Sequence, residues 1–243
     1  MELEKQQSEQ LLVHQSKFAS MGEMVANIAH QWRQPLTHLS YVNMNLKAAY
    51  DTKKLTSDYF DKKTNEINQQ IEFMSNTIND FRNFFKTDKR IEKFGILESF
   101  ESTYRLLNAT FKHCSIEVKV KCEEEIFVNS YKSEFSQVIF NILNNSKQAI
   151  EEKKINNPKI VINIAEQNKK VVLKISDNAL GIPKNIINNI FDPYFTTKED
   201  GMGIGLYMSK VIIETHMKGK LEVKNIPNGV LFEISLPLIE NVT

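Results

Sequence analysis

The stretch Gly22 to Leu36, GEMVANIAHQWRQPL, decides the first half of the fold, because its composition is helical until a proline follows a histidine by five residues. Apolar side chains recur every three or four residues through it, from 11 to 49. The positions of this seam, apolar except at His14, are Leu11, His14, Phe18, Met21, Val25, Ile28, Trp32, Pro35, Leu39, Val42, Leu46 and Ala49. A 4,3 alternation over several heptads predicts a long helix that packs against partner helices.

A second seam begins after the polar break DTKKLTSD at residues 51–58. Its positions are Phe60, Thr64, Ile67, Ile71, Met74, Ile78, Phe81 and Phe85. Two long helices joined by a short polar connection predict an antiparallel hairpin. A lone hairpin leaves one flank of each seam in water, so we expect two copies of the chain to form a four-helix bundle as a homodimer.

The register of the first seam predicts that His30 lies on the outside of the helix. With Val25 at heptad position a and Ile28 at d, His30 falls at f, about 170° from the centre of the seam. Pro35 follows one turn later at a d position, where it frees the carbonyl of Gln31 and lets the helix bend. An exposed helical histidine is most often an ordinary surface residue, so the register alone assigns it no function.

From about residue 90 the pattern becomes that of an α/β domain. Alternation predicts strands over SIEVKVKC (115–122), EIFVNS (125–130), KIVINIAEQ (159–167) and KKVVLKISD (169–177). Helical periodicity predicts helices near 97–113, over 131–152 and from about Gly205.

On the helix over 131–152, Asn141 and Asn145 lie one turn apart and share a face. Asparagine is a poor helix former, and its carboxamide oxygen suits a hard cation such as Mg²⁺ that also binds phosphate. Two ordinary solvated asparagines remain the alternative.

Two further patterns favour a nucleotide. Asp177 ends a strand before a glycine-containing turn, where a carboxylate accepts a hydrogen bond from an exocyclic amine while the turn leaves room for a flat ring. Closely spaced glycines then precede the last helix, where backbone N–H groups favour an anion, with Lys198 just upstream as a point charge. These glycines are Gly201, Gly203 and Gly205. A flexible loop is the alternative interpretation.

Composition limits the partners. Lys and Arg total 31 against 30 Asp and Glu, so the chain lacks the basic field of a sequence-independent nucleic-acid binder. No apolar run has the length of a membrane span, so we expect no direct membrane insertion and a soluble, cytoplasmic chain, or the cytoplasmic portion of a longer protein. Cys114 and Cys122 are expected to be free thiols, with a disulfide between them as the lesser alternative.

Five stretches occur in the order of the sequence boxes of the sensor histidine kinases of two-component systems. The stretches MGEMVANIAHQWRQPL, NILNNSKQAI, DNALGIP, FDPYFTTK and GMGIGL resemble that family's H, N, G1, F and G2 boxes. The resemblance covers most of residues 18 to 236. It implies an α hairpin, paired in a dimeric four-helix bundle, followed by an α/β two-layer sandwich of the Bergerat (GHKL) type.

The resemblance also implies a division into a signalling-helix linker (1–17), a dimerisation and phosphotransfer hairpin (18–89) and an ATP-binding domain (90–243). The linker would enter from an upstream sensor module that is absent from this chain. Implied partners are a second copy of the chain and the receiver domain of a response regulator, whose aspartate takes the phosphoryl group.

Residue by residue, the resemblance makes His30 the phosphoacceptor, with His38 as the one competing helical histidine. Asn141 and Asn145 would meet ATP phosphates, Asn145 with Mg²⁺. Asp177 would receive the adenine amine and Gly181 would shape the base pocket. The lid and phosphate turn would comprise Lys198, Gly201, Gly203 and Gly205.

Three positions depart from the family's pattern. Gln31 replaces the acidic residue that often follows the histidine, so it can orient the imidazole but cannot accept its proton. Gln34 stands where Thr or Asn often positions the dephosphorylating water, which puts phosphatase activity in doubt. Ala179 replaces the first glycine of the G1 turn. A non-catalytic nucleotide-binding scaffold and a GHKL-type ATPase, with Glu134 as its base, are the alternative functions.

Overall fold

The computed structural model describes residues 2–85, 90–198 and 202–238, without the side chains at 2–10, at several further α1 positions that include His30, and at 83–85. The helices are α1 (Glu2–Asp51), α2 (Ser57–Phe85), α3 (Ile96–His113), α4 (Lys132–Glu152), α5 (Gly205–Val211) and the π-helix η1 (Ile212–His216). The strands are β1 (Glu92–Gly95), β2 (Glu117–Cys122), β3 (Phe127–Ser130), β4 (Lys159–Gln167), β5 (Lys170–Asp177), β6 (Lys220–Ile226) and β7 (Gly229–Pro237).

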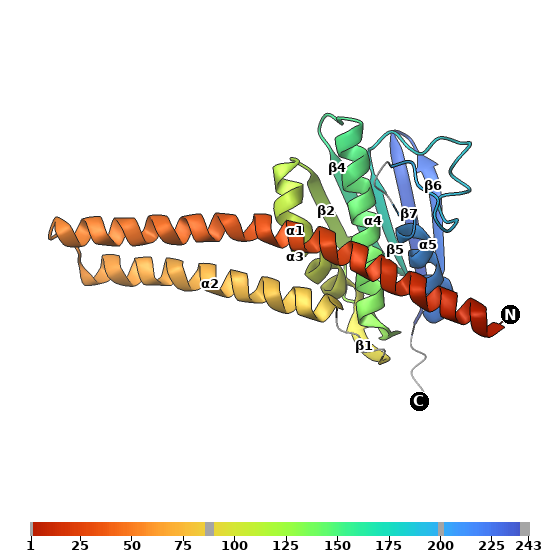
Figure 1. The fold of residues 1–243 in the computed structure, drawn as a ribbon, viewed down its shortest axis with the longest axis horizontal. Coiled ribbons are helices and arrows are strands. Elements are labelled where there is room, and N and C mark those ends of the chain that lie inside the picture. Colours follow the sequence, from red (N-terminus) through yellow and green to blue (C-terminus); the bar gives the residue numbers. More distant parts are fainter. Residues whose placement is uncertain (1, 86–89, 199–201, 239–243) are drawn as a thin grey trace.

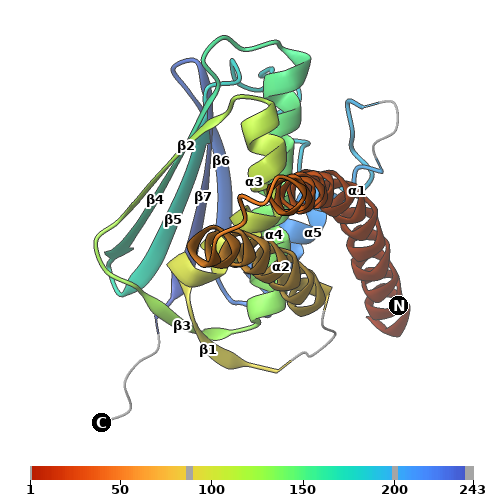
Figure 2. The same ribbon diagram turned by 90° about the vertical axis from the view of Figure 1, so that its left-hand side faces the viewer.

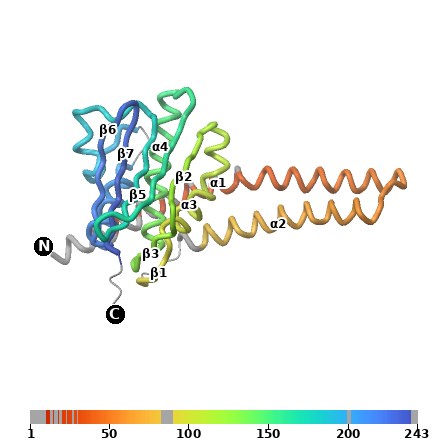
Figure 3. The backbone as a smooth tube through the Cα atoms, turned by 180° about the vertical axis from the view of Figure 1, so that it is seen from behind, coloured from red at the N-terminus to blue at the C-terminus, as the bar shows by residue number. Residues whose placement is uncertain are grey.

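The predicted antiparallel hairpin is confirmed, with α1 and α2 running side by side and projecting from the α/β domain (Figures 1 and 3). Helix α1 continues through the buried Pro35, and its two halves run in different directions (Figure 2). The N-terminal half lies across the α/β domain (Figure 1). The hairpin therefore touches the domain along both of its helices.

Burial along α1 departs from the predicted seam in its N-terminal half. Leu11 and Phe18 on the seam are 60% and 68% exposed, whereas Leu12 and Met24, which lie off it, are buried. Leu12 packs against Ile204 and Met208 at the start of α5. The heptad period identifies an apolar stripe, but a neighbouring stripe faces the α/β domain.

A mixed sheet forms one layer of this domain, in the order β2-β4-β5-β7-β6. Strand β2 is parallel to β4, and the other neighbours are antiparallel. Helices α3, α4 and α5 lie together on one face (Figure 2). Period-2 alternation turns Ile160, Ile162 and Ile164 into the core, where the largest fully buried side chains include four phenylalanines. The predicted helical region followed by a two-layer α/β sandwich is confirmed.

Three smaller features concern the cysteines, His216 and the hydropathy of the helices. Cys114 and Cys122 are free, as predicted. Nδ1 of His216 lies 2.7 Å from Oε2 of Glu134, and this contact ties η1 to the start of α4. In the described ranges, no helix combines the length and hydropathy that a bilayer crossing requires.

Candidate functional site

Asp177, the last residue of β5, is the buried acidic group of the site. Its Oδ1 accepts hydrogen bonds from the backbone N–H groups of Ala179 (3.0 Å) and Val230 (3.3 Å). Its Oδ2 accepts one from Oγ of Ser146 on α4 (2.9 Å). An ionised carboxylate accepts about four hydrogen bonds, so these three fix the group and leave capacity for a ligand donor.

The turn after Asp177 is fixed by its neighbours. Leu180 and Gly181 both have left-handed backbone angles, with φ values of 59° and 80°. Nζ of Lys153, at the end of α4, donates to the carbonyls of Ala179 (2.6 Å) and Gly181 (2.7 Å). A leucine in this conformation costs about 1–2 kcal/mol, which the lysine contacts offset.

Glycine is required beside this turn at two positions. A Cβ on Gly181 would lie 2.9 Å from Oδ1 of Asn225, a residue that already hydrogen-bonds both backbone groups of Ile182. A Cβ on Gly229 would lie 1.7 Å from the carbonyl oxygen of Asp177. The close approach of β7 to the end of β5 therefore depends on Gly229.

Three carboxamide side chains of α4, those of Asn141, Asn145 and Gln148, contact the segment that leads into α5 or α5 itself. Nδ2 of Asn141 donates to the carbonyl of Gly205 (3.1 Å) and to Oγ of Ser209 (3.3 Å), which ties α4 to α5. Oδ1 of Asn145 accepts from Nζ of Lys198 (3.0 Å), and Oε1 of Gln148 accepts from the same ammonium. The structure thus brings together Asn141 with Gly205 and Asn145 with Lys198, and their binding of phosphate stays a prediction.

The glycines before α5 play different parts. Gly203 has φ 65°, and a Cβ there would lie 2.4 Å from the carbonyl carbon of Tyr194. A Cβ on Gly205 would make only ordinary contact, 3.7 Å from the side chain of Asn141. Gly201 lies outside the described residues. Only Gly203 of this pair is demanded by the backbone.

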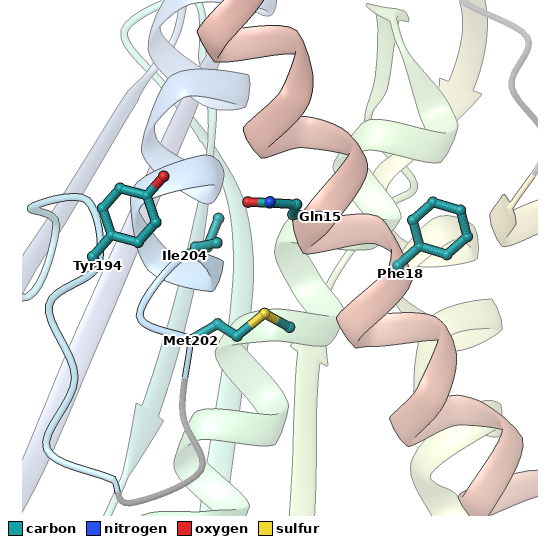
Figure 4. A pocket seen from close by; sticks show the side chains of 5 residues that line it. All are labelled: Gln15, Phe18, Tyr194, Met202 and Ile204. Carbon is teal, nitrogen blue, oxygen red and sulfur yellow. The ribbon is translucent and has the colours of Figure 1, made fainter.

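Helix α1 passes beside this turn. A pocket of about 550 Å³ is lined by Gln15 and Phe18 of α1 and by Tyr194, Met202 and Ile204 (Figure 4). The lining is almost entirely apolar apart from Gln15 and the Tyr194 hydroxyl. The same helix that carries His30 therefore borders the segment that leads into α5.

The residues around the predicted phosphoacceptor face different surroundings. His30 lies within α1, and its side chain is outside the described part of the chain. Gln31 is 2% exposed, and its Nε2 donates to the carbonyls of Leu106 (2.7 Å) and Arg105 (3.3 Å) on α3. Gln34 is exposed and Pro35 buried. The side-chain amide of Gln31 therefore donates its hydrogen bonds to α3. From the sequence, Gln31 was a residue that can orient the imidazole of His30.

Sequence reasoning missed four site residues: Ser146, Gln148, Lys153 and Gly229. Gln148 carried a signal, since it lies three residues after Asn145 on the same helical face. Lys153 and Gly229 act on backbone that is distant in sequence, so no local pattern marks them.

Comparisons with known proteins place these features in a family. Residues 131–240 match the model described as histidine kinase-, DNA gyrase B- and HSP90-like ATPase. The chain is 29% identical over 241 residues (95% of its length) to the two-component sensor PprA of Pseudomonas aeruginosa. It is 28% identical over 242 residues (96% of its length) to sporulation kinase A of Bacillus subtilis.

Two solved structures of the histidine kinase ThkA are similar as well. Its catalytic domain has a TM-score of 0.55 at 28% identity, and the match covers 61% of this chain and 95% of that one. ThkA in complex with the response regulator protein TrrA has a TM-score of 0.52 at 26% identity, covering 98% of this chain and 67% of that one.

The chain spans 26% of the length of PprA and 37% of sporulation kinase A. The likeness nevertheless extends through both the helical hairpin and the α/β domain, since it includes 95% or more of this chain. Residues 131–240 therefore form an ATPase domain of the histidine kinase, DNA gyrase B and HSP90 type, and the chain as a whole is similar to sensor histidine kinases.

Proposed function

We propose that this chain is an ATP-dependent autokinase that phosphorylates its own His30 and passes the phosphoryl group to an aspartate of a response regulator. One observation carries the proposal most strongly. Consecutive residues of α4 serve both ends of one site: Asn145 bonds Lys198, and Ser146 bonds Asp177. Adjacent residues of one helix thus contact both the residues proposed to bind phosphate and the pocket proposed to bind the base.

The adenine end of the site uses Asp177. Its carboxylate is fixed by three donors and accepts a fourth hydrogen bond from the exocyclic amine of the base. Gly181, in the left-handed turn that Lys153 holds, keeps side-chain atoms away from the ring edge. Both features select a flat ring that carries an amine.

The phosphate end uses Lys198 and the backbone of the Gly203 turn. Lys198 leaves its carboxamide partners for the phosphate oxygens, which are stronger acceptors. Asn141 holds α5 in place through Gly205 and Ser209. These residues bind and orient the triphosphate, and Lys198 stabilises the negative charge on its transferring group.

Mg²⁺ fits the donor set on α4. The carboxamide oxygens of Asn145 and Gln148 converge on one cationic group, the Lys198 ammonium, so they are already directed at a common point. These are neutral oxygen ligands of the kind that Mg²⁺ accepts together with phosphate oxygens. When bound, the ion would neutralise charge on the triphosphate.

In the chemical step, the unprotonated nitrogen of a neutral His30 imidazole attacks the γ-phosphorus in line. The new nitrogen–phosphorus bond forms as the bond to the bridging oxygen breaks, and ADP leaves with that electron pair. The other ring nitrogen then releases its proton. An ordinary imidazole pKa is about 6.5, so the group is mostly neutral above pH 7. Gln31 orients the ring when its amide is free.

The proposed second copy of the chain is supported by burial on α2. Ile67 and Met74, at one seam position, are half-buried, whereas Ile71 and Ile78, at the other, are 53% and 47% exposed. One flank of the seam is therefore covered within the chain and the other is free. A second hairpin would cover it and complete a four-helix bundle.

The receiver-domain partner is supported by the similarity to ThkA, which was solved in complex with its response regulator protein. The match extends over 98% of this chain, so it includes the hairpin on which His30 lies. We expect the phosphoryl group to pass from His30 to an aspartate of such a domain, with Gln34, exposed one turn after His30, at the contact.

The test is incubation of the purified chain with γ-labelled ATP and Mg²⁺, comparing the wild type with His30→Gln and His38→Gln. Acid-labile, alkali-stable label that is lost only in His30→Gln supports the proposal. Absence of label from a chain that binds ATP in a separate titration would contradict it. Phosphate release without label would indicate an ATPase, although Glu134, the base which that function needs, is bonded to His216.

A further inference from the structure

The hairpin makes polar contacts with α3 of the α/β domain at two points, and the first is Gln31. This side chain directly follows His30, is 2% exposed and donates to the carbonyls of Leu106 and Arg105. A carboxamide has two N–H donors, so an amide that serves two carbonyls has none left for a third acceptor. In this arrangement Gln31 cannot also donate to the imidazole of His30.

The second contact comes from α2. Oδ1 of Asp80 accepts a hydrogen bond from Oγ of Ser102 (3.1 Å). Its two carboxylate oxygens also accept from the Arg105 guanidinium, at 2.9 Å from Nε and 3.4 Å from Nη2. The Asp80 side chain is 16% exposed and that of Arg105 is 57% exposed, so solvent reaches the ion pair from the arginine side. Arg105 thus meets both helices of the hairpin, through its carbonyl and its guanidinium.

Helix α3 contributes no residue to the site described above, which is built from α4, the segments that flank β5 and the start of α5. The residue next to the phosphoacceptor is therefore fastened to a helix outside the nucleotide site. The Gln31 and Asp80 contacts themselves use no residue of the nucleotide site, whereas Leu12 of α1 packs separately on the start of α5.

Two polar side-chain atoms of Gln31 and the residue after it have no hydrogen-bond partner among the described atoms. They are Oε1 of Gln31 and Nε1 of Trp32, and both are buried. Buried polar atoms that lack partners regain water when an interface opens, which favours separation. Opening of the contact between Gln31 and α3 would therefore give Oε1 of Gln31 access to water.

We propose that Gln31 and Asp80 form a two-point latch on α3 that holds the α/β domain in a resting position, and that release of the latch frees Gln31 to orient His30. The latch regulates the autokinase of the preceding subsection and in that respect rests on it. Gln31 and Asp80 are positioning residues, because they act on the placement of the domain and its phosphoacceptor.

The residue type at position 31 fits this role. A glutamate carboxylate has no N–H group to donate to the two carbonyl oxygens of α3. Its negative charge would also be buried beside those oxygens, which is unfavourable. A glutamine supplies the N–H groups that both carbonyls require. The departure from an acidic residue at this position is therefore what a latch on α3 needs.

The test uses Gln31→Ala and Asp80→Arg, with Asp61→Arg as the matched control, since Asp61 is an exposed acid on the same helix. Small-angle scattering of the full chain measures the radius of gyration, and light scattering verifies an unchanged oligomeric state. We expect both latch variants to have a larger radius of gyration than the wild type and the control.

The kinetic arm uses Asp80→Arg, which leaves the neighbours of His30 intact. We expect its autophosphorylation kcat to rise about threefold to tenfold with an unchanged KM for ATP. The double variant Asp80→Arg with Arg105→Asp restores an opposite-charge pair and should return both the rate and the radius of gyration toward wild type. A merely structural role for Asp80 would give no such rescue.

The latch and the autokinase can fail separately. If the radius of gyration is the same in Gln31→Ala, Asp80→Arg and wild type, the latch is overturned even where His30 takes label. If the latch variants expand and the double variant recovers, the latch stands even where no variant takes label, and it is then the autokinase that is overturned.

Discussion

At the scale of single residues, Asp177 shows how a site residue is fixed before its ligand arrives. Its three donors come from α4, from the following turn and from the start of β7. Its place at the end of a strand before a glycine turn could be predicted from the sequence. Ser146 and Val230 could not, because a bond across 31 or 53 positions leaves no local pattern.

Asp177→Asn should weaken ATP binding about 10-fold to 100-fold, because a neutral amide replaces the charged acceptor at about 1.5–3 kcal/mol. The fold should survive, since the amide oxygen still accepts from both backbone N–H groups. Calorimetric titration with ATP measures the affinity, and thermal unfolding checks the fold. Wild-type affinity in a folded variant would show that Asp177 does not meet the base.

Lys153→Met should also weaken ATP binding, by several-fold, without removing any atom from the pocket. The Lys153 ammonium donates hydrogen bonds to the carbonyls of Ala179 and Gly181 and so holds the turn in place. Methionine has a side chain of similar length but no N–H donors. Lys154→Met, an exposed neighbour outside the turn, is the control. Equal affinities in the two variants would contradict this role.

Cys114 gives a prediction about pH. Burial, reinforced by its hydrogen bond to Glu151, raises the pKa of the thiol to about 11. The reactive thiolate is therefore scarce at pH 8, and its fraction increases about tenfold for each pH unit toward 11. Alkylation of folded Cys122→Ser protein by iodoacetamide, followed by mass spectrometry, should be slow at pH 8 and accelerate accordingly. Rapid alkylation at pH 8 would disprove the raised pKa.

At the scale of elements, the hydrophobic periodicity of the sequence located the helices and the strands β2 to β5 to within a few residues, whereas β1, β6 and β7 were not predicted. The predicted helix over 131–152 became α4 (Lys132–Glu152), and the strand over 169–177 became β5 (Lys170–Asp177). The parallel pairing of β2 with β4 and the π-helix after α5 had no such signal. Both depend on contacts between elements, which a period within one element does not encode.

The turn into α5 allows a matched test of two glycines. Gly203→Ala should lower the free energy of unfolding by about 1–3 kcal/mol, because the added Cβ meets the Tyr194 backbone in a left-handed conformation. Gly205→Ala, with only ordinary contacts, should change it by less than about 1 kcal/mol. Urea unfolding measures both. Equal effects would mean that the turn does not pack on Tyr194 as described.

At the scale of the whole molecule, the hairpin and the α/β sandwich were predictable, but their mutual placement was not. The heptad seam identified Leu11 and Phe18 as buried, yet in the single chain Leu12 packs on the start of α5 instead. A helix with two apolar stripes has two partners, and period alone does not say which stripe meets which. One stripe of α1 contacts the domain, and the other is exposed in the single chain, where the proposed second copy would pack.

This division of surfaces yields a prediction about assembly. Ile71 and Phe73 are similarly exposed in the single chain, at 53% and 46%, but only Ile71 lies on the seam, and two helical positions separate the side chains by about 200°. Ile71→Glu should therefore place a charge in the proposed four-helix core and weaken the dimer at least tenfold, whereas Phe73→Glu should not. Sedimentation equilibrium measures both dissociation constants. Dimers of equal strength in the two variants would mean that the copies meet elsewhere, and the stripe of α1 and α2 would then need a different partner.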